Sequence, residues 1–154
     1  MTPLDDTDKA ILRLLQEDAK YTNKEIASRL NLSTTPVFER IKRLEREGVI
    51  RKYVALADRK KVNLGLVSFC NVSLKQHAME LLVRFEEDVK SLPEVVECYH
   101  IAGMFDYLLK VVVKDMEAYQ QFVSRKLAAV ENIGRVQSAF VMTELKNSTF
   151  LHFE

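Results

Sequence analysis

The stretch from residue 32 to residue 48 carries the sequence signals of one complete helix. Ser33 suits the N-cap position, where its hydroxyl can accept a hydrogen bond from a backbone N–H of the first turn. Pro36 falls in the first turn, where its missing N–H is tolerated, and Gly48 suits the left-handed conformation just past the end. Three apolar residues at helical spacing predict one buried stripe: Val37, Ile41 and Leu44. We therefore expect a short helix with one buried side.

The exposed side of this helix combines short polar residues at its start with basic residues along its length. That combination suits entry into the DNA major groove, although such a face is more often simply solvated. Its candidates for DNA contact are Ser33, Thr34, Thr35, Pro36, Glu39, Arg40, Lys42 and Arg43. Base-edge contacts are expected from Thr34, Thr35 and Glu39, and phosphate contacts from the three basic residues, because most protein–DNA hydrogen bonds go to the backbone. The alternative for Arg40 is an internal salt bridge to the neighbouring Glu39 or Glu45.

Two shorter helices are expected upstream, and they strengthen the DNA interpretation. Asp5 begins the first, with further acidic residues in the first turn where the helix dipole favours them, and this helix should end near Asp18. Thr22 and Glu25 form a capping box that starts the second helix. Two short helices, a tight turn and a basic third helix predict a helix-turn-helix. Backbone N–H groups at Thr22 and Asn23 could also bind a phosphate.

The hydrophobic period changes after residue 48. Residues 49–56 are rich in β-branched and aromatic side chains and predict a strand, which would form a small wing or a linker with Lys52 available to a phosphate. The polar segment 58–61 predicts a boundary between a DNA-binding domain over 1–61 and a second domain over 62–154. Residues 1–62 hold 14 Lys and Arg against 10 Asp and Glu, whereas the remainder holds 9 against 12. This asymmetry suggests different partners for the two domains.

The second domain alternates strand and helix patterns. Strands are expected over residues 66–74, 95–101, 107–113 and 133–145, and helices over 78–91 and from an N-cap at Asp115 through Leu127. This order predicts a ferredoxin-like βαββαβ domain, an antiparallel sheet with both helices on one face. The chain is therefore expected to be α+β, with an N-terminal (winged) helix-turn-helix followed by this domain. The second face of the sheet needs a cover, and self-association is the simplest one.

Composition excludes several classes of protein. No apolar run approaches the roughly 18 residues of a membrane helix, and the N-terminus lacks a secretion signal, so we expect a cytoplasmic protein. Cys70 and Cys98 have no metal-type spacing and are expected to be buried free thiols rather than a disulfide. Neither a metal, a cofactor nor an enzyme activity is expected, because no histidine has ligand spacing and no phosphate loop or nucleophile elbow is present. Small oxygenases on ferredoxin-like dimers are the enzyme alternative, but the sequence supplies none of their chemistry.

Three motifs lie in order along the chain: Leu4-Asp5-x-x-Asp8-x-x-Ile11-Leu12, Leu32-Ser33-x-x-x-Val37-x-x-Arg40-Ile41-Lys42-Arg43-Leu44-Glu45-x-x-Gly48-Val49-Ile50 and Gly103-x-x-Asp106-Tyr107-Leu108-Leu109. Together they resemble the Lrp/AsnC family of bacterial and archaeal regulators, over essentially the whole chain. The resemblance implies a DNA-binding head joined to a ferredoxin-like domain that binds an amino acid. It also implies homodimers, commonly four in a ring as an octamer around which double-stranded DNA can wrap, and hence association with the nucleoid.

The segment 103–106 between two expected strands has two interpretations. A hairpin turn, with positive φ at Gly103 and a side-chain bond from Asp106 to the backbone, explains both residues without a ligand. An open turn also exposes backbone groups to the carboxylate and ammonium of an amino acid. The resemblance favours the second and places the effector between dimers, although two bulky residues in the turn would narrow the site. The candidates for effector binding are His100, Gly103, Met104, Phe105, Asp106, Met116, Ser138, Ala139 and Phe140.

These expectations combine into a sequence-specific DNA-binding transcription regulator that responds to an amino acid or related small effector through its C-terminal domain. The alternative is an effector-blind architectural protein that wraps DNA through multivalent assembly. Both hypotheses use the same head and the same oligomer. They differ in whether the 103–106 region holds a ligand that shifts assembly or DNA affinity.

Overall fold

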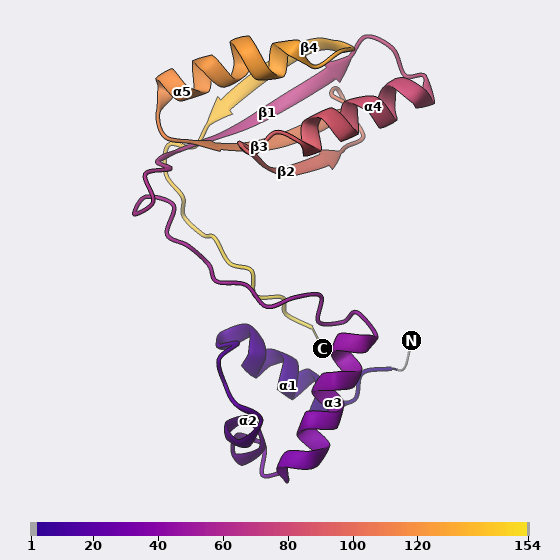
Figure 1. Ribbon diagram of the computed structural model, residues 1–154, viewed down its shortest axis with the longest axis vertical. Helices are drawn as coiled ribbons and strands as arrows, with labels where there is room; N and C mark the ends of the chain where they lie inside the picture. The colour runs from indigo at the N-terminus through magenta and orange to yellow at the C-terminus, as the bar shows by residue number, and fades with distance from the viewer. Residues whose placement is uncertain (1–2, 154) are drawn as a thin grey trace. The chain divides into compact units, whose positions relative to one another are not determined.

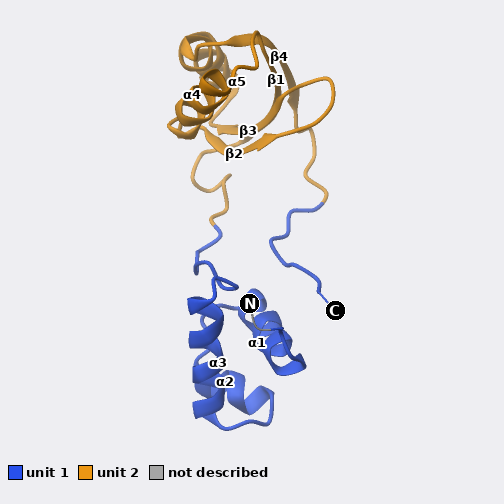
Figure 2. Cartoon of the chain, turned by 90° about the vertical axis from the view of Figure 1, so that its right-hand side faces the viewer, with its two compact units in different colours: residues 1–56, 146–154 blue, residues 57–145 orange. Residues whose placement is uncertain are grey.

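The computed structural model describes residues 3–153, which divide into two compact units (Figure 2). The first unit comprises the described residues of 1–56 and 146–154, and the second is Ala57–Leu145. Residues 57–61, which we assigned to the DNA-binding domain, therefore group with the second unit. The C-terminal residues from Lys146 onward, assigned to the second domain, group with the first.

Three helices form the first unit: α1 (Asp6–Glu17), α2 (Asn23–Arg29) and α3 (Thr34–Arg46) (Figure 1). The expected starts of α1 and α2 are confirmed, because Asp5 and Thr22 each form a complete capping box. The position of Ser33 at the N-cap of α3 is also confirmed. The prediction of a capping bond is wrong, because the hydroxyl of Ser33 makes no hydrogen bond to the first turn. Gly48 has a φ of 73°, as expected for the residue past the last turn.

The core of this unit is built from one side of each helix. Ile11, Ile26, Val37 and Leu44 are completely buried. The stripe predicted for α3 is confirmed, since Ile41 is buried beside them. Phe153, from the far end of the chain, packs against the same cluster. The short helices thus owe their stability to a shared apolar centre, as expected for helices of this length.

Residues 49–56 do not form the expected strand. The segment leaves α3 without regular secondary structure, and Val54 and Leu56 are 57% and 73% exposed. A strand needs backbone partners on a neighbouring strand, and no other described segment of this chain pairs with it. The strand expected over 133–145 likewise ends early, at Phe140. Lys52 therefore lies on an exposed, irregular linker.

The second unit has the expected ferredoxin-like arrangement. Its antiparallel sheet has the order β2-β3-β1-β4. The strands are β1 (Leu66–Leu74), β2 (Val95–His100), β3 (Tyr107–Val113) and β4 (Ile133–Phe140). The helices α4 (Met79–Lys90) and α5 (Met116–Gln121) both cover one face of the sheet (Figure 2). α5 continues into a π-helical turn and a 3₁₀ turn, so the helical stretch reaches Ala129.

The two faces of this sheet differ in burial. Alternate residues of β1 and β3, such as Cys70, Val72 and Leu109, are buried against the helices. On the opposite face Phe69 is only half-buried, and Tyr99 is 49% exposed. Both cysteines are free, as expected, with Cys70 buried and Cys98 half-buried. No helix in the described part of the chain is long and apolar enough to cross a membrane.

Candidate DNA interface and effector site

The first turns of α3 present polar side chains that are free to contact a ligand. Thr34, Thr35 and Glu39 are exposed, and within the described residues their side chains have no hydrogen bond or ion pair. Pro36 is exposed beside them, and the Ser33 hydroxyl makes no capping bond. This geometry is compatible with the predicted base contacts, which stay a prediction.

Two of the three basic candidates on α3 have partners inside the head. Arg40 Nη1 lies 2.7 Å from Oδ1 of Asp8 and 2.6 Å from Oδ2 of Asp5, and Arg43 Nη2 pairs with Oδ2 of Asp8. The Asp8 side chain is 1% exposed, and a buried carboxylate needs such partners. The salt-bridge alternative for Arg40 is thus the observed one, but its partners lie on α1 and at its N-cap. The expected partners Glu39 and Glu45 were wrong, because α3 packs this flank against the start of α1.

These bonds hold the start of α1 to the middle of α3. Bonds to the backbone N–H of Asp8 and to Arg40 hold the pKa of Asp5 below its usual value, and the bonds to Asp5 and Asp8 raise the pKa of Arg40. Both charges are therefore maintained at neutral pH. The phosphate contacts of Arg40 and Arg43 stay a prediction, and in the structure both residues pair with Asp8.

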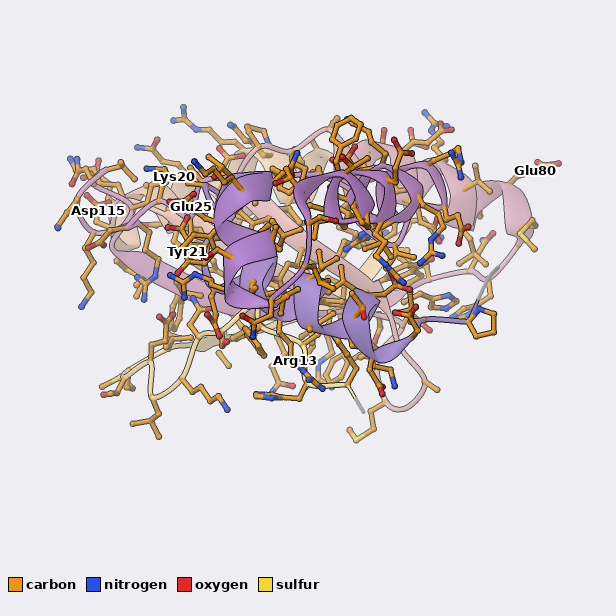
Figure 3. The ribbon with its side chains drawn as sticks, turned by 90° about the horizontal axis from the view of Figure 1, so that it is seen from below. Arg13, Lys20, Tyr21, Glu25, Glu80 and Asp115 are labelled. Atoms are coloured by element: carbon orange, nitrogen blue, oxygen red, sulfur yellow. The ribbon has the colours of Figure 1, made fainter. Side chains whose placement is uncertain are left out.

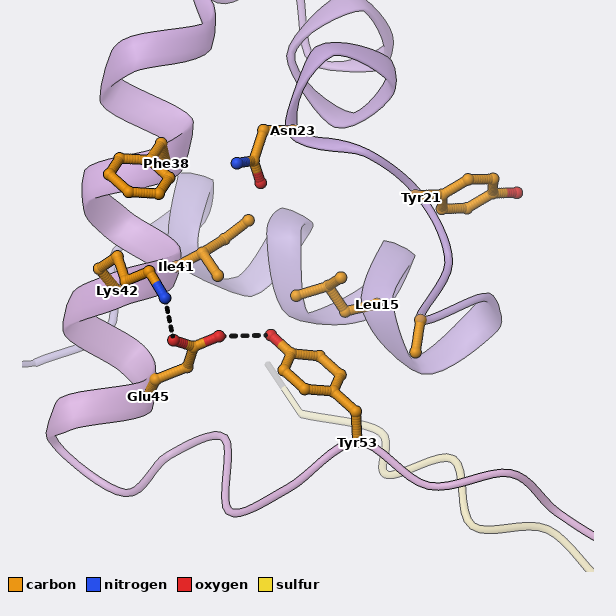
Figure 4. Close-up of a pocket in the computed structure, with 9 residues that line it drawn as sticks. Leu15, Tyr21, Asn23, Phe38, Ile41, Lys42, Glu45 and Tyr53 are labelled. Atoms are coloured by element: carbon orange, nitrogen blue, oxygen red, sulfur yellow. Dashed lines mark hydrogen bonds and ion pairs between the residues drawn. The ribbon is translucent and has the colours of Figure 1, made fainter.

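Lys42 lies on the other flank of α3, beside a groove of about 210 Å³ (Figure 4). Its ammonium lies 3.0 Å from Oε2 of Glu45, whose other oxygen accepts a 3.0 Å hydrogen bond from the hydroxyl of Tyr53. Desolvation, and then Glu45, raise the pKa of Tyr53 to about 12, so this hydroxyl remains a donor. The linker is thereby tied to α3. Asn23 also borders this groove, whereas the Thr22 hydroxyl is engaged in its capping box.

The C-terminal segment is bound along α1. Gln16 donates to the carbonyl of Leu151 at 3.2 Å and accepts from its N–H at 2.7 Å. Arg13, which Figure 3 labels, donates to the carbonyl of Phe153 at 3.0 Å, and its guanidinium lies over the Phe153 ring. Sequence reasoning did not anticipate this contact, since these partners are separated by 135 or more residues.

The turn before β3 has the features of the hairpin interpretation. Gly103 has a φ of 143°, and Met104 is 87% exposed. Asp106 accepts a 2.7 Å hydrogen bond from the backbone N–H of Leu74 at the end of β1, rather than the expected bond from the backbone of its own turn. Its own N–H donates to the carbonyl of Val72 at 2.9 Å. An added Cβ at Gly103 would meet no atom within 4 Å, so the turn is also open to a ligand.

The other effector candidates fall into two groups. His100 stacks on Tyr107, with ring centroids 4.8 Å apart, and Phe105 packs under the guanidinium of Arg135, so both belong to the neighbourhood of the turn. Ser138, Ala139 and Phe140 instead pair with the opposite end of β1, at residues 68–70, and Phe140 contacts Tyr119 of α5. Four residues of strand between Cys70 and Leu74 correspond to roughly 13 Å.

One chain therefore does not gather all nine candidates in one place. Ser138 accepts a 2.5 Å hydrogen bond from Tyr119, in a cluster that also contains Cys70. Met116 lies at the start of α5 and is 53% exposed. Sequence reasoning missed His77, whose Nε2 lies 2.9 Å from Oδ1 of Asp106. The only sequence signal for it was a histidine three residues after a strand.

Comparisons with known proteins agree with both units. A model described as the Lrp/AsnC ligand binding domain matches residues 67–151, and one described as winged helix-turn-helix DNA-binding matches residues 4–51. The DNA-binding transcriptional activator DecR of Escherichia coli (strain K12) is 38% identical over 98% of this chain and 99% of its own. The leucine-responsive regulatory protein of the same strain is 37% identical over 96% and 90%. The solved structure of a transcriptional regulator–L-Met complex from Neisseria meningitidis has a TM-score of 0.93 and 39% identity, with 97% of each chain covered.

Proposed function

The chain belongs to the Lrp/AsnC family of transcription regulators, and we propose that it contacts base edges with the start of α3 and an α-amino acid with the turn around Gly103. The protein is a DNA-binding regulator with a ligand-binding domain. The observation that supports the DNA assignment most directly is the set of exposed, unbonded side chains at Thr34, Thr35 and Glu39. Such groups lose no internal partner when they bind a base.

Phosphate contacts are assigned first to Lys42 and Lys52, and to the N–H group at Asn23. The N–H of Thr22, the other backbone candidate, already donates to Oε2 of Glu25 at 2.7 Å. Both lysines are exposed, and surface ion pairs such as that of Lys42 with Glu45 are weak enough to exchange for a phosphate. Arg40 and Arg43 already pair with the buried carboxylate of Asp8, so a phosphate contact would have to form beside that ion pair or replace it. We therefore propose that they act mainly by fixing the angle of α3.

The effector is proposed to be an α-amino acid with an apolar side chain. The turn offers an acidic group, Asp106, for the ammonium and the open backbone around Gly103 for the carboxylate. Met104 and Phe105 supply apolar surface for the side chain. The relative from Neisseria meningitidis was solved with L-Met, which makes L-methionine the first amino acid to test.

The functional form is proposed to be a homodimer that assembles further, as an octamer. The half-buried second face of the sheet, with Phe69 and Tyr99, is the surface that a second copy would cover. Effector candidates near Asp106 and near Ser138 are well separated within one chain, so a site containing both groups requires residues from another copy. The proposed location is the cytoplasm, at the nucleoid, with no cofactor and no catalytic role.

Thermal unfolding of the full chain with each of the twenty amino acids tests the effector proposal. A ligand that binds only the folded state must raise the melting temperature in a concentration-dependent way. We expect one or a few apolar amino acids to do so, and the same ones to change sedimentation and operator affinity. Operator binding and assembly that are indifferent to all twenty would support the architectural alternative instead.

A further inference from the structure

His77 completes the bonding of the Asp106 carboxylate. One oxygen of Asp106 accepts the N–H of Leu74 at 2.7 Å, and the other lies 2.9 Å from Nε2 of His77. The His77 side chain is 63% exposed, whereas that of Asp106 is 23% exposed. The imidazole is therefore the more exposed member of this pair.

The surroundings of this pair contain few other charges. His100 stacks on Tyr107 and is close enough to Asp106 to favour its ionised form. Arg135 reaches the turn only through the ring of Phe105. Among the residues that the structure describes, His77 is the one titratable side chain in direct contact with Asp106. His77 is therefore the side chain placed to act most directly on this carboxylate.

We propose that His77 is a further residue of the effector site, which positions Asp106 and makes amino-acid binding weaken when its imidazole is protonated. This inference rests on the proposed function, in which Asp106 receives the effector ammonium. A neutral imidazole leaves the negative charge of Asp106 uncompensated, so an ammonium is attracted. An imidazolium forms an ion pair with Asp106 and repels a second cation.

Histidine suits this role because it is the side chain that ordinarily changes charge between about pH 5 and 8. When binding expels one proton, affinity falls by at most about tenfold for each pH unit on the acid side. The fold of the turn does not depend on His77. Asp106 keeps its backbone bond to Leu74, its N–H bond to Val72 and the bond that its carbonyl accepts from the N–H of Ile101.

The test is calorimetric titration of the full-length protein with L-methionine between pH 5.5 and 8.5, for the wild type and His77→Gln. Glutamine retains a hydrogen-bond donor but does not titrate. We expect the wild-type affinity to fall on acidification by up to about tenfold per pH unit, and His77→Gln to bind with nearly constant affinity. His152→Gln, in the C-terminal segment, is the control and should keep the wild-type profile.

His100→Gln separates the two histidines near Asp106. Whatever its affinity at pH 8.5, its pH dependence should match the wild type. The proposal is overturned if His77→Gln retains the wild-type pH dependence, if His100→Gln loses it, or if wild-type affinity rises on acidification. Should no amino acid bind the wild type at any pH, the proposed function itself fails; binding with an unaltered profile in His77→Gln overturns only the role of His77.

Discussion

Arg40 of α3 donates to the carboxylate of Asp8, which lies two residues into α1 and is completely buried. Asp8 also completes the capping box of α1 by accepting the N–H of Asp5 at 3.2 Å. The same carboxylate thus caps the start of α1 and pairs with α3, the helix proposed to enter the major groove. The basic residues of α3 divide between this internal role, on one flank, and an exposed flank that contains Lys42.

Asp8→Ala should destabilise the head strongly. The substitution removes the capping bond and leaves two guanidinium groups without their buried partner. Because both arginines are partly exposed and can regain water, we expect a loss of about 2 kcal/mol, below the full cost of breaking a buried ion pair. Urea denaturation measures it. Asp6→Ala, in the same turn but fully exposed, should leave the transition unchanged.

Lys42→Ala and Arg40→Ala should weaken DNA binding for different reasons. Lys42→Ala removes an exposed charge, so we expect lower affinity for every sequence and a salt dependence reduced by about one unit, with stability unchanged. Arg40→Ala should lower the unfolding free energy by about 1 kcal/mol. Its DNA affinity should fall because α3 is less firmly positioned, with the salt dependence unchanged. Fluorescence anisotropy over a range of salt concentrations, beside urea denaturation, distinguishes the two. An unstable Lys42→Ala, or a stable Arg40→Ala with a reduced salt slope, would reverse the assignment.

Gln16→Ala should release the C-terminal segment from α1. It removes both hydrogen bonds to Leu151, while the contact of Arg13 with Phe153 remains. Hydrogen exchange of the Leu151 amide should accelerate, and we expect a stability loss of about 1 kcal/mol. Glu17→Ala, one residue along and exposed, is the matched control. Unchanged exchange in Gln16→Ala would show that Phe153 alone holds the segment.

Local and distant contacts differ in how well the sequence predicted them. The N-cap at Asp5 and the capping box of Thr22 with Glu25 are local features, so they were visible in the sequence and are confirmed. The reciprocal bond that makes Asp5 and Asp8 a capping box as well was not predicted. The Arg40–Asp8 pair and the Gln16–Leu151 bonds join residues 32 and 135 apart, and no local pattern distinguishes them from ordinary surface charges. The strand expected over 49–56 failed for a related reason. Strand propensity is a property of one segment, whereas a strand also requires a partner strand, which no other described segment of this chain provides.

In the candidate effector site, too, the sequence predicted local features and missed contacts between distant residues. Gly103 and Asp106 were predictable as turn residues, and Gly103 has the expected positive φ. The Asp106 carboxylate, however, bonds to the N–H of Leu74 on β1 and not within the turn. His77 was not predictable, because its significance arises only when the end of β1 lies beside the turn. The roles of Ser138 and Phe140 also depend on position in the sheet. Their distance from Asp106 follows from strand register, which the sequence pattern did not specify.

Asp106 should make the second unit sensitive to acid. The bond from the N–H of Leu74, and then His77, hold the pKa of Asp106 below its ordinary value of 3.8. Because the folded pKa lies below the unfolded one, the stabilisation is present above about pH 4 and is lost as pH falls through the folded value. Urea midpoints between pH 6 and 2.5 should fall more steeply in the wild type than in Asp106→Asn. Parallel curves would exclude this contribution.

Asp106→Ala should also uncouple the effector from assembly. If the turn lies where copies meet, the amino acid acts on the association of copies, and it shifts that equilibrium only by its differential affinity for the two states. Couplings of roughly 1–3 kcal/mol are usual, which corresponds to about 5- to 150-fold in association. Asp106→Ala should therefore reduce the effect of L-methionine on sedimentation and on operator affinity together. Ligand-free binding to a single short operator should persist, since the head is untouched. A full response to L-methionine in Asp106→Ala would place the effector elsewhere and leave the segment 103–106 as a turn only.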